Sequence, residues 1–186
     1  MFYNREELEK IGFKKIGENV LISNKCSIYG AKNIEIGSNV RIDDFCILSP
    51  TGSLIIGDYV HIACYSSIIG KGDVILEDFV GISGRVSIYS STDDYTGMGM
   101  TNPTVPDKYK KVTNGIVHIK KHSIIGCGSI VMPNITINMG VSIYAQSLVI
   151  NDCEELSIYS GIPVKKINKR LTKFLKYEKE FNGDNK

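Results

Sequence analysis

The sequence predicts an all-β protein, a parallel β-helix built from hexapeptide repeats. Three observations lead to this prediction. Apolar residues recur at every sixth position over most of the chain, small or β-branched residues usually follow them four places later, and one long polar segment interrupts the pattern. Hexapeptide periodicity of this kind is typical of a parallel β-helix.

The aliphatic members of the repeat occupy five runs. These are Ile16, Ile22, Ile28; Ile36, Ile42, Leu48; Ile56, Ile62, Ile68; Leu76, Ile82, Ile88; and Ile119, Ile125, Val131, continuing into Ile137, Ile143, Val149. Three hexapeptides complete one triangular coil, so we expect these side chains to point inward while successive coils pair as parallel strands. The alternative is an antiparallel β-sandwich, whose strands alternate with period two. A sandwich gives no reason for a period of six.

A solenoid has open ends, and the sequence predicts a helix at each of them. Residues 1–13 form the expected N-terminal helical cap, in which Asn4 and Glu7 can make a capping box. Coils are expected at 14–89 and 117–162. Residues 163–180 are expected to form a C-terminal helix, with Pro163 in its first turn and an apolar stripe along one face. We expect residues 1–186 to form a single domain.

Residues 90–116 form the interruption. They are rich in Gly, Pro, Ser, Thr, Asp and Asn, which predicts a loop extruded from the coils. A loop this long in a compact domain is usually functional, and it can wall a ligand site against a neighbouring surface. Tyr95 and Asn102 are its candidate substrate-binding residues. The alternative is a loop that only makes an interface.

Composition limits the classes of partner. The chain has 22 Lys and Arg against 20 Asp and Glu, which indicates no general attraction to nucleic acid or to membranes. No apolar stretch approaches the ~20 residues that cross a bilayer, so we expect no membrane insertion. Five cysteines without a CxxC pair predict free thiols in a reducing compartment. We therefore predict a cytoplasmic protein without a signal peptide.

Several motifs together resemble a known family. The hexapeptide runs, the single loop, the segment HIKKHSIIGCGSIVMPNITI and the closing element Gly161-Ile162-Pro163-Val164-Lys165 resemble the hexapeptide-repeat acyltransferases over nearly the whole chain. The pattern is similar to galactoside O-acetyltransferases and to N-acetyltransferases of dTDP-4-amino-4,6-dideoxyglucose (dTDP-viosamine). The resemblance implies a left-handed β-helix, a homotrimer with active sites between subunits, acetyl-CoA as co-substrate and no metal.

The resemblance also implies where acetyl-CoA lies. Two residues match positions that line the pantetheine channel through their backbones, and two serines mark the adjoining corners. These are Cys127, Ala145, Ser129 and Ser147.

Basic residues near the C-terminus are candidates for the CoA phosphates. Lys165 matches a basic residue of the family's closing motif, and Lys166 and Arg170 can add positive charge. The alternative for each is a solvated helix face. Asn151 stands where the family has a second basic residue, which weakens the transfer of these contacts.

The loop departs from the O-acetyltransferase pattern in a way that bears on the reaction. Asp93 or Asp94 stands where those enzymes carry a histidine that deprotonates the acceptor hydroxyl. A hydroxyl needs such a base, whereas a neutral amine attacks a thioester directly. A carboxylate can hold the amine and help to accept its proton, so Asp93 and Asp94 are predicted catalytic residues for an amino-sugar acceptor.

Other candidates lie on the coils. His61 is predicted to face the acceptor groove and to be catalytic, with Tyr65 beside it as an acceptor-binding residue. His122 is a weaker candidate for substrate binding. Asp43 and Asp44 are expected to form a solvated corner rather than a catalytic pair.

The sequence therefore favours an acetyl-CoA-dependent sugar acetyltransferase of surface-polysaccharide (lipopolysaccharide, O-antigen) biosynthesis. The favoured acceptor is the amino group of a nucleotide-linked 4-amino-4,6-dideoxy sugar. O-acetylation of a sugar hydroxyl is the first alternative. A non-catalytic trimeric β-helix scaffold is the second.

Overall fold

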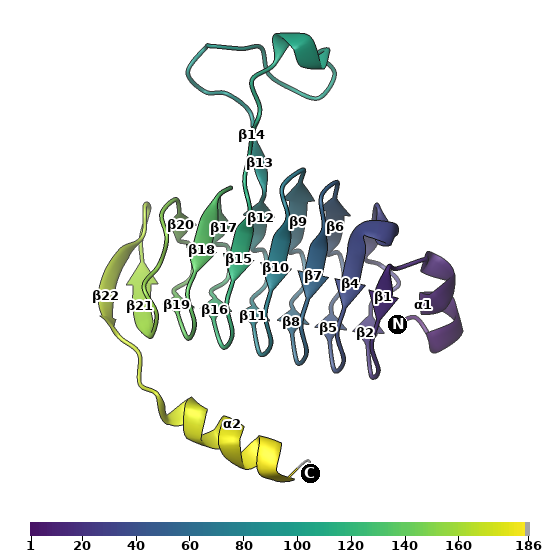
Figure 1. Cartoon of the computed structure of the whole chain (residues 1–186), viewed down its shortest axis with the longest axis vertical. Coiled ribbons are helices and arrows are strands. Elements are labelled where there is room, and N and C mark those ends of the chain that lie inside the picture. Colours follow the sequence, from purple (N-terminus) through teal and green to yellow (C-terminus); the bar gives the residue numbers. More distant parts are fainter. Residues whose placement is uncertain (185–186) are drawn as a thin grey trace.

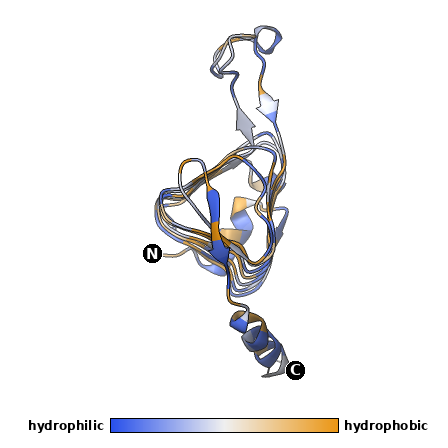
Figure 2. Ribbon diagram, turned by 90° about the vertical axis from the view of Figure 1, so that its left-hand side faces the viewer, coloured by the Kyte–Doolittle hydropathy of each residue, from blue (hydrophilic) through white to orange (hydrophobic). Residues whose placement is uncertain are grey.

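The computed structural model describes residues 1–184 and forms a left-handed parallel β-helix of about seven turns. Figure 2 looks along the prism and shows its triangular cross-section, with the loop projecting above it and the C-terminal helix lying below it. Three sheets form the faces, and their strands stack coil upon coil along the prism in Figure 1.

Each of the first six coils gives one strand to each sheet, and sheet 2 has two further strands at its C-terminal end. Sheet 1 contains β1 (Lys15–Ile16), β4 (Ile34–Ile36), β7 (Leu54–Ile56), β10 (Val74–Leu76), β15 (Val117–Ile119) and β18 (Ile135–Ile137). Sheet 2 contains β2 (Leu21–Ile22), β5 (Arg41–Ile42), β8 (His61–Ile62), β11 (Gly81–Ile82), β16 (Ile124–Ile125), β19 (Ser142–Ile143), β21 (Ser157–Ser160) and β22 (Lys165–Lys169). Sheet 3 contains β3 (Ser27–Ile28), β6 (Ile47–Pro50), β9 (Ser67–Gly70), β12 (Ser87–Tyr89), β17 (Ile130–Val131) and β20 (Leu148–Val149).

The predicted inward column is confirmed. From Ile22 to Val149, every aliphatic member of the six-residue pattern except Ile28 has an exposed fraction of at most 2%. Ile16 and Ile28, in the first coil, are half-buried and pack against this core. The small residues four places later are buried as well, and serines among them satisfy their hydroxyls on backbone carbonyls, as Ser66 does on Ser83. The coils are thus a packed core without a lumen.

One edge of the prism carries a column of left-handed residues. Asn19, Asn39, Tyr59, Phe79 and His122 have φ between 54° and 61°. The turn forces each side chain outward, directly above its equivalent in the previous coil. The rings of Tyr59 and Phe79 stack at 5.0 Å, and those of Phe79 and His122 stack at 4.9 Å. This aromatic column provides a docking surface for the C-terminal helix.

The N-terminal cap is confirmed. Helix α1 (Arg5–Ile11) has the predicted capping box, because Asn4 accepts from the Glu7 amide and Glu7 accepts from the Asn4 amide. Leu8 is buried against the first coil, which covers that end of the core. A short helix, η1 (Ala31–Asn33), turns the chain into β4.

The predicted loop leaves the prism between β12 and β15 and stands away from it (Figure 1). Its two stems pair as antiparallel strands, β13 (Ser91–Thr92) and β14 (Thr113–Asn114). The short helix η2 (Asp107–Tyr109) lies near its tip. This pairing fixes the direction in which the loop projects.

The prediction of one continuous helix over 163–180 is wrong in its first half. Lys165–Lys169 form β22, which pairs antiparallel with β21, and helix α2 (Lys173–Asp184) begins only at Lys173. The last coil has an open strand edge, and β22 satisfies its backbone groups. Ile167 and Leu171 are consequently 52% and 85% exposed, so they do not belong to a buried stripe.

Helix α2 runs back along the aromatic column. Phe174 lies 5.0 Å from the His122 ring, and Phe181 lies 5.2 Å from the Tyr59 ring, measured between ring centroids. Among the described residues, no helix combines the length and the apolar character needed to cross a membrane.

Candidate active site

An open cleft of about 260 Å³ lies on the outer surface of sheet 2. His61 of β8, Gly81 of β11 and Ile124 of β16 are register partners in three successive coils, so they form one outward column across the cleft. The remaining lining residues are Ala63, Ile82, Ser83 and Gly84. The cleft therefore combines an imidazole and a hydroxyl with small and aliphatic groups.

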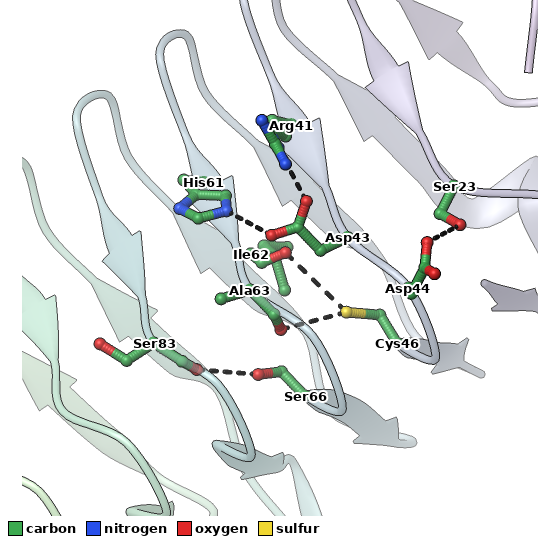
Figure 3. Close-up of polar contacts among 10 residues, drawn as sticks. All are labelled: Ser23, Arg41, Asp43, Asp44, Cys46, His61, Ile62, Ala63, Ser66 and Ser83. Atoms are coloured by element: carbon green, nitrogen blue, oxygen red, sulfur yellow. Dashed lines mark hydrogen bonds and ion pairs between the residues drawn. The ribbon is translucent and has the colours of Figure 1, made fainter. Parts of the chain in front are cut away.

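His61 is oriented by the carboxylate of Asp43. Its Nε2 lies 2.8 Å from Oδ2 of Asp43, and the Arg41 Nε donates to Oδ1 of the same carboxylate at 2.7 Å (Figure 3). The expectation of Asp43 as a solvated corner is thus wrong, because its side chain is only 19% exposed. The length of one coil of the β-helix places residue 43 beside residue 61. Counting residues by this coil length would have predicted the pair.

The surroundings of Asp43 favour its charged form. Burial acts to raise the pKa of Asp43, but hydrogen bonds from His61 and Arg41 outweigh it, and the pKa lies below its usual value. The carboxylate is therefore ionised near neutral pH. It accepts from Nε2 of His61, and a neutral ring then keeps its lone pair on Nδ1. Such a ring can take a proton from an acceptor group.

Asp44 binds residues of the preceding coil and does not contact His61. It accepts hydrogen bonds from the Ser23 hydroxyl and from the Lys25 ammonium at 3.1 Å (Figure 3 shows the Ser23 contact). These contacts tie two coils together.

The two loop aspartates have different surroundings. Asp94 accepts from the backbone amides of Thr96, Met98 and Gly99 and from the Thr96 hydroxyl. The Thr96 hydroxyl and these amides hold the pKa of Asp94 below its usual value. Asp94 is therefore the organising residue of the loop.

Asp93 is less engaged. Its Oδ2 accepts from the Asn102 amide at 3.2 Å, and its side chain lines a second cleft of about 350 Å³ between the loop and sheet 3. Asn102 lines the same cleft and uses its own Oδ1 to hold Thr104. The structure thus brings Asp93 and Asn102 together at one cleft.

The two clefts share no lining residue. His61 lies in sheet 2 and Ser83 directly follows its strand β11, whereas Asp93 lies at the base of the loop. Within one chain, the predicted catalytic residues are therefore divided between two surfaces.

The remaining substrate candidates are dispersed. Tyr65 stacks on Phe45 at 5.0 Å, with the Arg85 guanidinium 5.5 Å from its ring, and is 52% exposed. Tyr95 is 88% exposed on the loop.

His122 is committed to packing. It lies between Phe79 and Phe174, its Nε2 is 2.8 Å from the Glu178 carboxylate, and its side chain is only 11% exposed. Hydrogen bonds from Lys121 and His122 lower the pKa of Glu178. His122 thus anchors α2, which its predicted role at the acceptor groove did not anticipate.

The candidate CoA residues on the coils fall into two pairs. Cys127 and Ala145 are exposed at corners of successive coils. Ser129 and Ser147 are buried, and both hydroxyls donate to the Tyr144 carbonyl. Only the first pair is available to a ligand.

The basic candidates also differ. Lys165 is exposed, and Lys166 pairs with Glu154 at 2.6 Å. The Arg170 guanidinium donates to the carbonyls of His122, Gly140 and Val141 and lies over the Phe174 ring. Arg170 therefore fastens the C-terminal segment to the coils.

In residues 1–184, no group of three or more His, Cys, Asp and Glu side chains lies close enough together to hold a metal ion.

No protein-family model matches the chain. The chain is 52% identical, over 96% of its length and 96% of the relative's length, to dTDP-4-amino-4,6-dideoxy-D-glucose acyltransferase from Escherichia coli. AntD, an N-acyltransferase from Bacillus cereus, matches at 47% identity over 98% of both chains, with a TM-score of 0.95, in a structure of an aspartate variant that contains dTDP and coenzyme A.

Other AntD structures contain dTDP with 3-hydroxybutyryl-CoA, or, in a serine variant, dTDP-4-amino-4,6-dideoxyglucose with coenzyme A. The acetyltransferase domain of PglB from Neisseria gonorrhoeae shares the fold at 18% identity, with a TM-score of 0.59 over 80% of this chain and 57% of that domain.

The hexapeptide coils, the single extruded loop and the cleft on sheet 2 define a hexapeptide-repeat acyltransferase. At this identity and coverage, the chain belongs to the family of dTDP-4-amino-4,6-dideoxy-D-glucose acyltransferases.

Proposed function

We propose that this protein transfers an acetyl group from acetyl-CoA to the 4-amino group of a dTDP-linked 4-amino-4,6-dideoxy sugar. The observation that carries the proposal is the 52% identity to an acyltransferase named for that acceptor. The complexes of AntD with dTDP, with the amino sugar and with coenzyme A support the same pair of substrates. The product would enter a bacterial surface polysaccharide such as an O-antigen.

We assign the loop carboxylate of the reaction to Asp93. The AntD structures carry substitutions at two positions, a serine and an aspartate. In AntD, the aspartate lies ten positions after the serine. Here Asp93 has Ser83 ten positions before it, whereas the residue ten positions before Asp94 is Gly84. The contacts agree with this choice, because Asp94 is engaged by four donors and Asp93 by one amide.

The chemistry requires little from the protein beyond placement. The neutral amine attacks the thioester carbonyl, the new C–N bond forms, and the C–S bond breaks to release the CoA thiolate. Asp93 holds the amine and takes the proton that it loses. The Ser83 hydroxyl, which has no hydrogen-bond partner in the described part of the chain, donates to the carbonyl oxygen as negative charge develops there.

We further propose a homotrimer in which each active site is shared. The separation of Asp93 from the Ser83 cleft supports this, because a second copy can bring its loop to the sheet 2 surface. Cys127 and Ala145 would border the pantetheine, and Lys165 would meet the CoA phosphates. Five unpaired cysteines fit a reducing cytoplasm.

A second candidate function has its own observation. The His61–Asp43 pair is suited to deprotonating a hydroxyl, which is the activation that O-acetylation of a sugar requires. In this alternative, His61 is the base, and the acceptor is a sugar without an amine.

A thiol-release assay with acetyl-CoA and a panel of acceptors separates the two functions. The panel contains dTDP-, UDP- and GDP-linked 4-amino sugars, the matching 4-hydroxy sugars and simple galactosides. We expect thiol release only with amino sugars, and most with the dTDP-linked one. Release with hydroxy sugars alone would replace the proposal with O-acetylation.

A further inference from the structure

Gly81 is a glycine that the fold does not require. It is the first residue of strand β11, outside the left-handed region of φ, and a Cβ built on it would meet only Ile124 Cγ1 at 3.7 Å, an ordinary van der Waals distance. Glycine in a strand weakens it and often marks a place where another molecule approaches the backbone.

Other glycines of the coils contrast with Gly81. A Cβ on Gly57 would lie 2.8 Å from the Asp78 amide nitrogen, and one on Gly126 would lie 2.5 Å from the Ala145 amide nitrogen. Those two positions exclude any side chain because the next coil passes too close. Gly81 lacks this reason, so its missing side chain serves something other than coil packing.

The missing side chain opens a notch in a row of larger groups. His61 and Ile124, the register partners of Gly81, rise on either side of it, and Ile124 is 40% exposed. Ser83 and Ala63 border the same cleft. The notch is therefore apolar on the Ile124 side, and its polar groups, His61 and Ser83, lie on the cleft where the proposed reaction takes place.

We propose that Gly81 and Ile124 form the subsite for the C6 methyl group of the acceptor sugar, and that they select 6-deoxy sugars. This inference rests on the proposed function. In a 4-amino-4,6-dideoxy sugar, the methyl group sits on C5, directly beside the carbon that carries the amine. An amine placed at Ser83 therefore brings the methyl group into the adjoining notch.

The selection follows from the chemistry of the notch. A methyl group buried against Ile124 and the Gly81 backbone leaves water favourably. A 6-hydroxyl turned to the Ile124 side would lose water against aliphatic atoms, because His61 lies on the other side of Gly81, and this loss is unfavourable. Any side chain at position 81 would occupy the space that the methyl group needs.

The test measures kcat/KM with acetyl-CoA for two acceptors, dTDP-4-amino-4,6-dideoxyglucose and its 6-hydroxy counterpart. We expect the wild type to prefer the 6-deoxy acceptor by about tenfold or more. Gly81→Val should lose about tenfold or more in kcat/KM for the 6-deoxy acceptor, through KM, while the Kd for CoA and the unfolding temperature stay near the wild-type values. Ile124→Thr should lower the preference for the 6-deoxy acceptor by about tenfold.

Gly183→Ala is the matched control, since Gly183 also has open space for a Cβ and lies in α2. Gly183→Ala should leave kcat/KM unchanged for both acceptors. An inactive wild type would refute the proposed function itself. An active wild type that does not distinguish the acceptors, or a folded Gly81→Val or Ile124→Thr variant with unchanged preference and KM, would overturn the methyl subsite.

Discussion

The imidazole Nε2 of His61 lies 2.8 Å from Oδ2 of Asp43, which belongs to the preceding coil. The contact follows from the strand register, because β5 and β8 are neighbours in sheet 2 with Arg41 opposite His61. It joins two residues that are 18 positions apart in the sequence. The pair gives the cleft an imidazole held in one orientation.

Asp43 should make stability depend on pH. Its folded-state pKa is lowered overall, so the ionised carboxylate stabilises the fold above its unfolded pKa of about 3.9, and this contribution is lost as the pH falls through the folded value. The unfolding free energies of the wild type and Asp43→Asn, measured in urea, should therefore differ at pH 6–7, and the difference should shrink as the pH falls below about 3.9. A difference in unfolding free energy that is constant with pH would contradict this account.

Asp93 and Asp94 should respond differently to the same substitution. Asp93→Asn removes the proposed proton acceptor and should lower kcat by about 100-fold or more, with the loop still ordered. Asp94→Asn weakens the acceptor for three amides and should raise KM and increase protease cleavage within 95–105. Steady-state kinetics and limited proteolysis measure the two effects. Full activity in Asp93→Asn would remove Asp93 from the mechanism.

Substitution of Arg170 should lower stability, whereas substitution of Lys165 should weaken CoA binding. Arg170→Ala leaves three carbonyls without their charged donor and should cost about 2 kcal/mol of unfolding free energy. Lys165→Ala should leave the unfolding temperature unchanged and weaken CoA binding several-fold, because exposed charge acts mainly on the phosphates. Calorimetric titration with CoA and thermal unfolding make the comparison. The reverse pattern would show that the two assignments are exchanged.

Subunit mixing should reveal a shared site. Ser83→Tyr fills the sheet 2 cleft, and Asp93→Asn lacks the loop carboxylate, so each variant alone should be nearly inactive. Random mixed trimers contain sites that combine an intact cleft with an intact loop, and refolding the two variants together should restore about one quarter of wild-type activity. A mixture as inactive as its components would place both residues in the same chain's site.

The sequence predicted the coils because each buried column repeats the same short pattern. Ile62, Ile82 and Ile125 are all at most 1% exposed for the reason that the repeat indicated. The start of α2 was missed because Lys165–Lys169 have no strand pattern of their own. They become a strand only because β21 offers an unpaired edge, and such an edge is a property of the assembled coils.

The site was predicted less completely than the fold. Asp93 and His61 were predicted as site residues through the family resemblance, and both line clefts. The partner of His61, the anchoring role of His122 and the notch at Gly81 depend on which residues of different coils become neighbours. A sequence read locally does not contain this information, whereas the coil register does.

The most direct test of the central claim is the structure of the product. The purified protein is incubated with acetyl-CoA and dTDP-4-amino-4,6-dideoxyglucose, and the nucleotide sugar is isolated and examined by NMR and mass spectrometry. We expect one added acetyl group, with an amide proton coupled to H4 of the sugar. An acetyl ester on a ring hydroxyl, or an unmodified sugar while CoA is bound, would contradict the account.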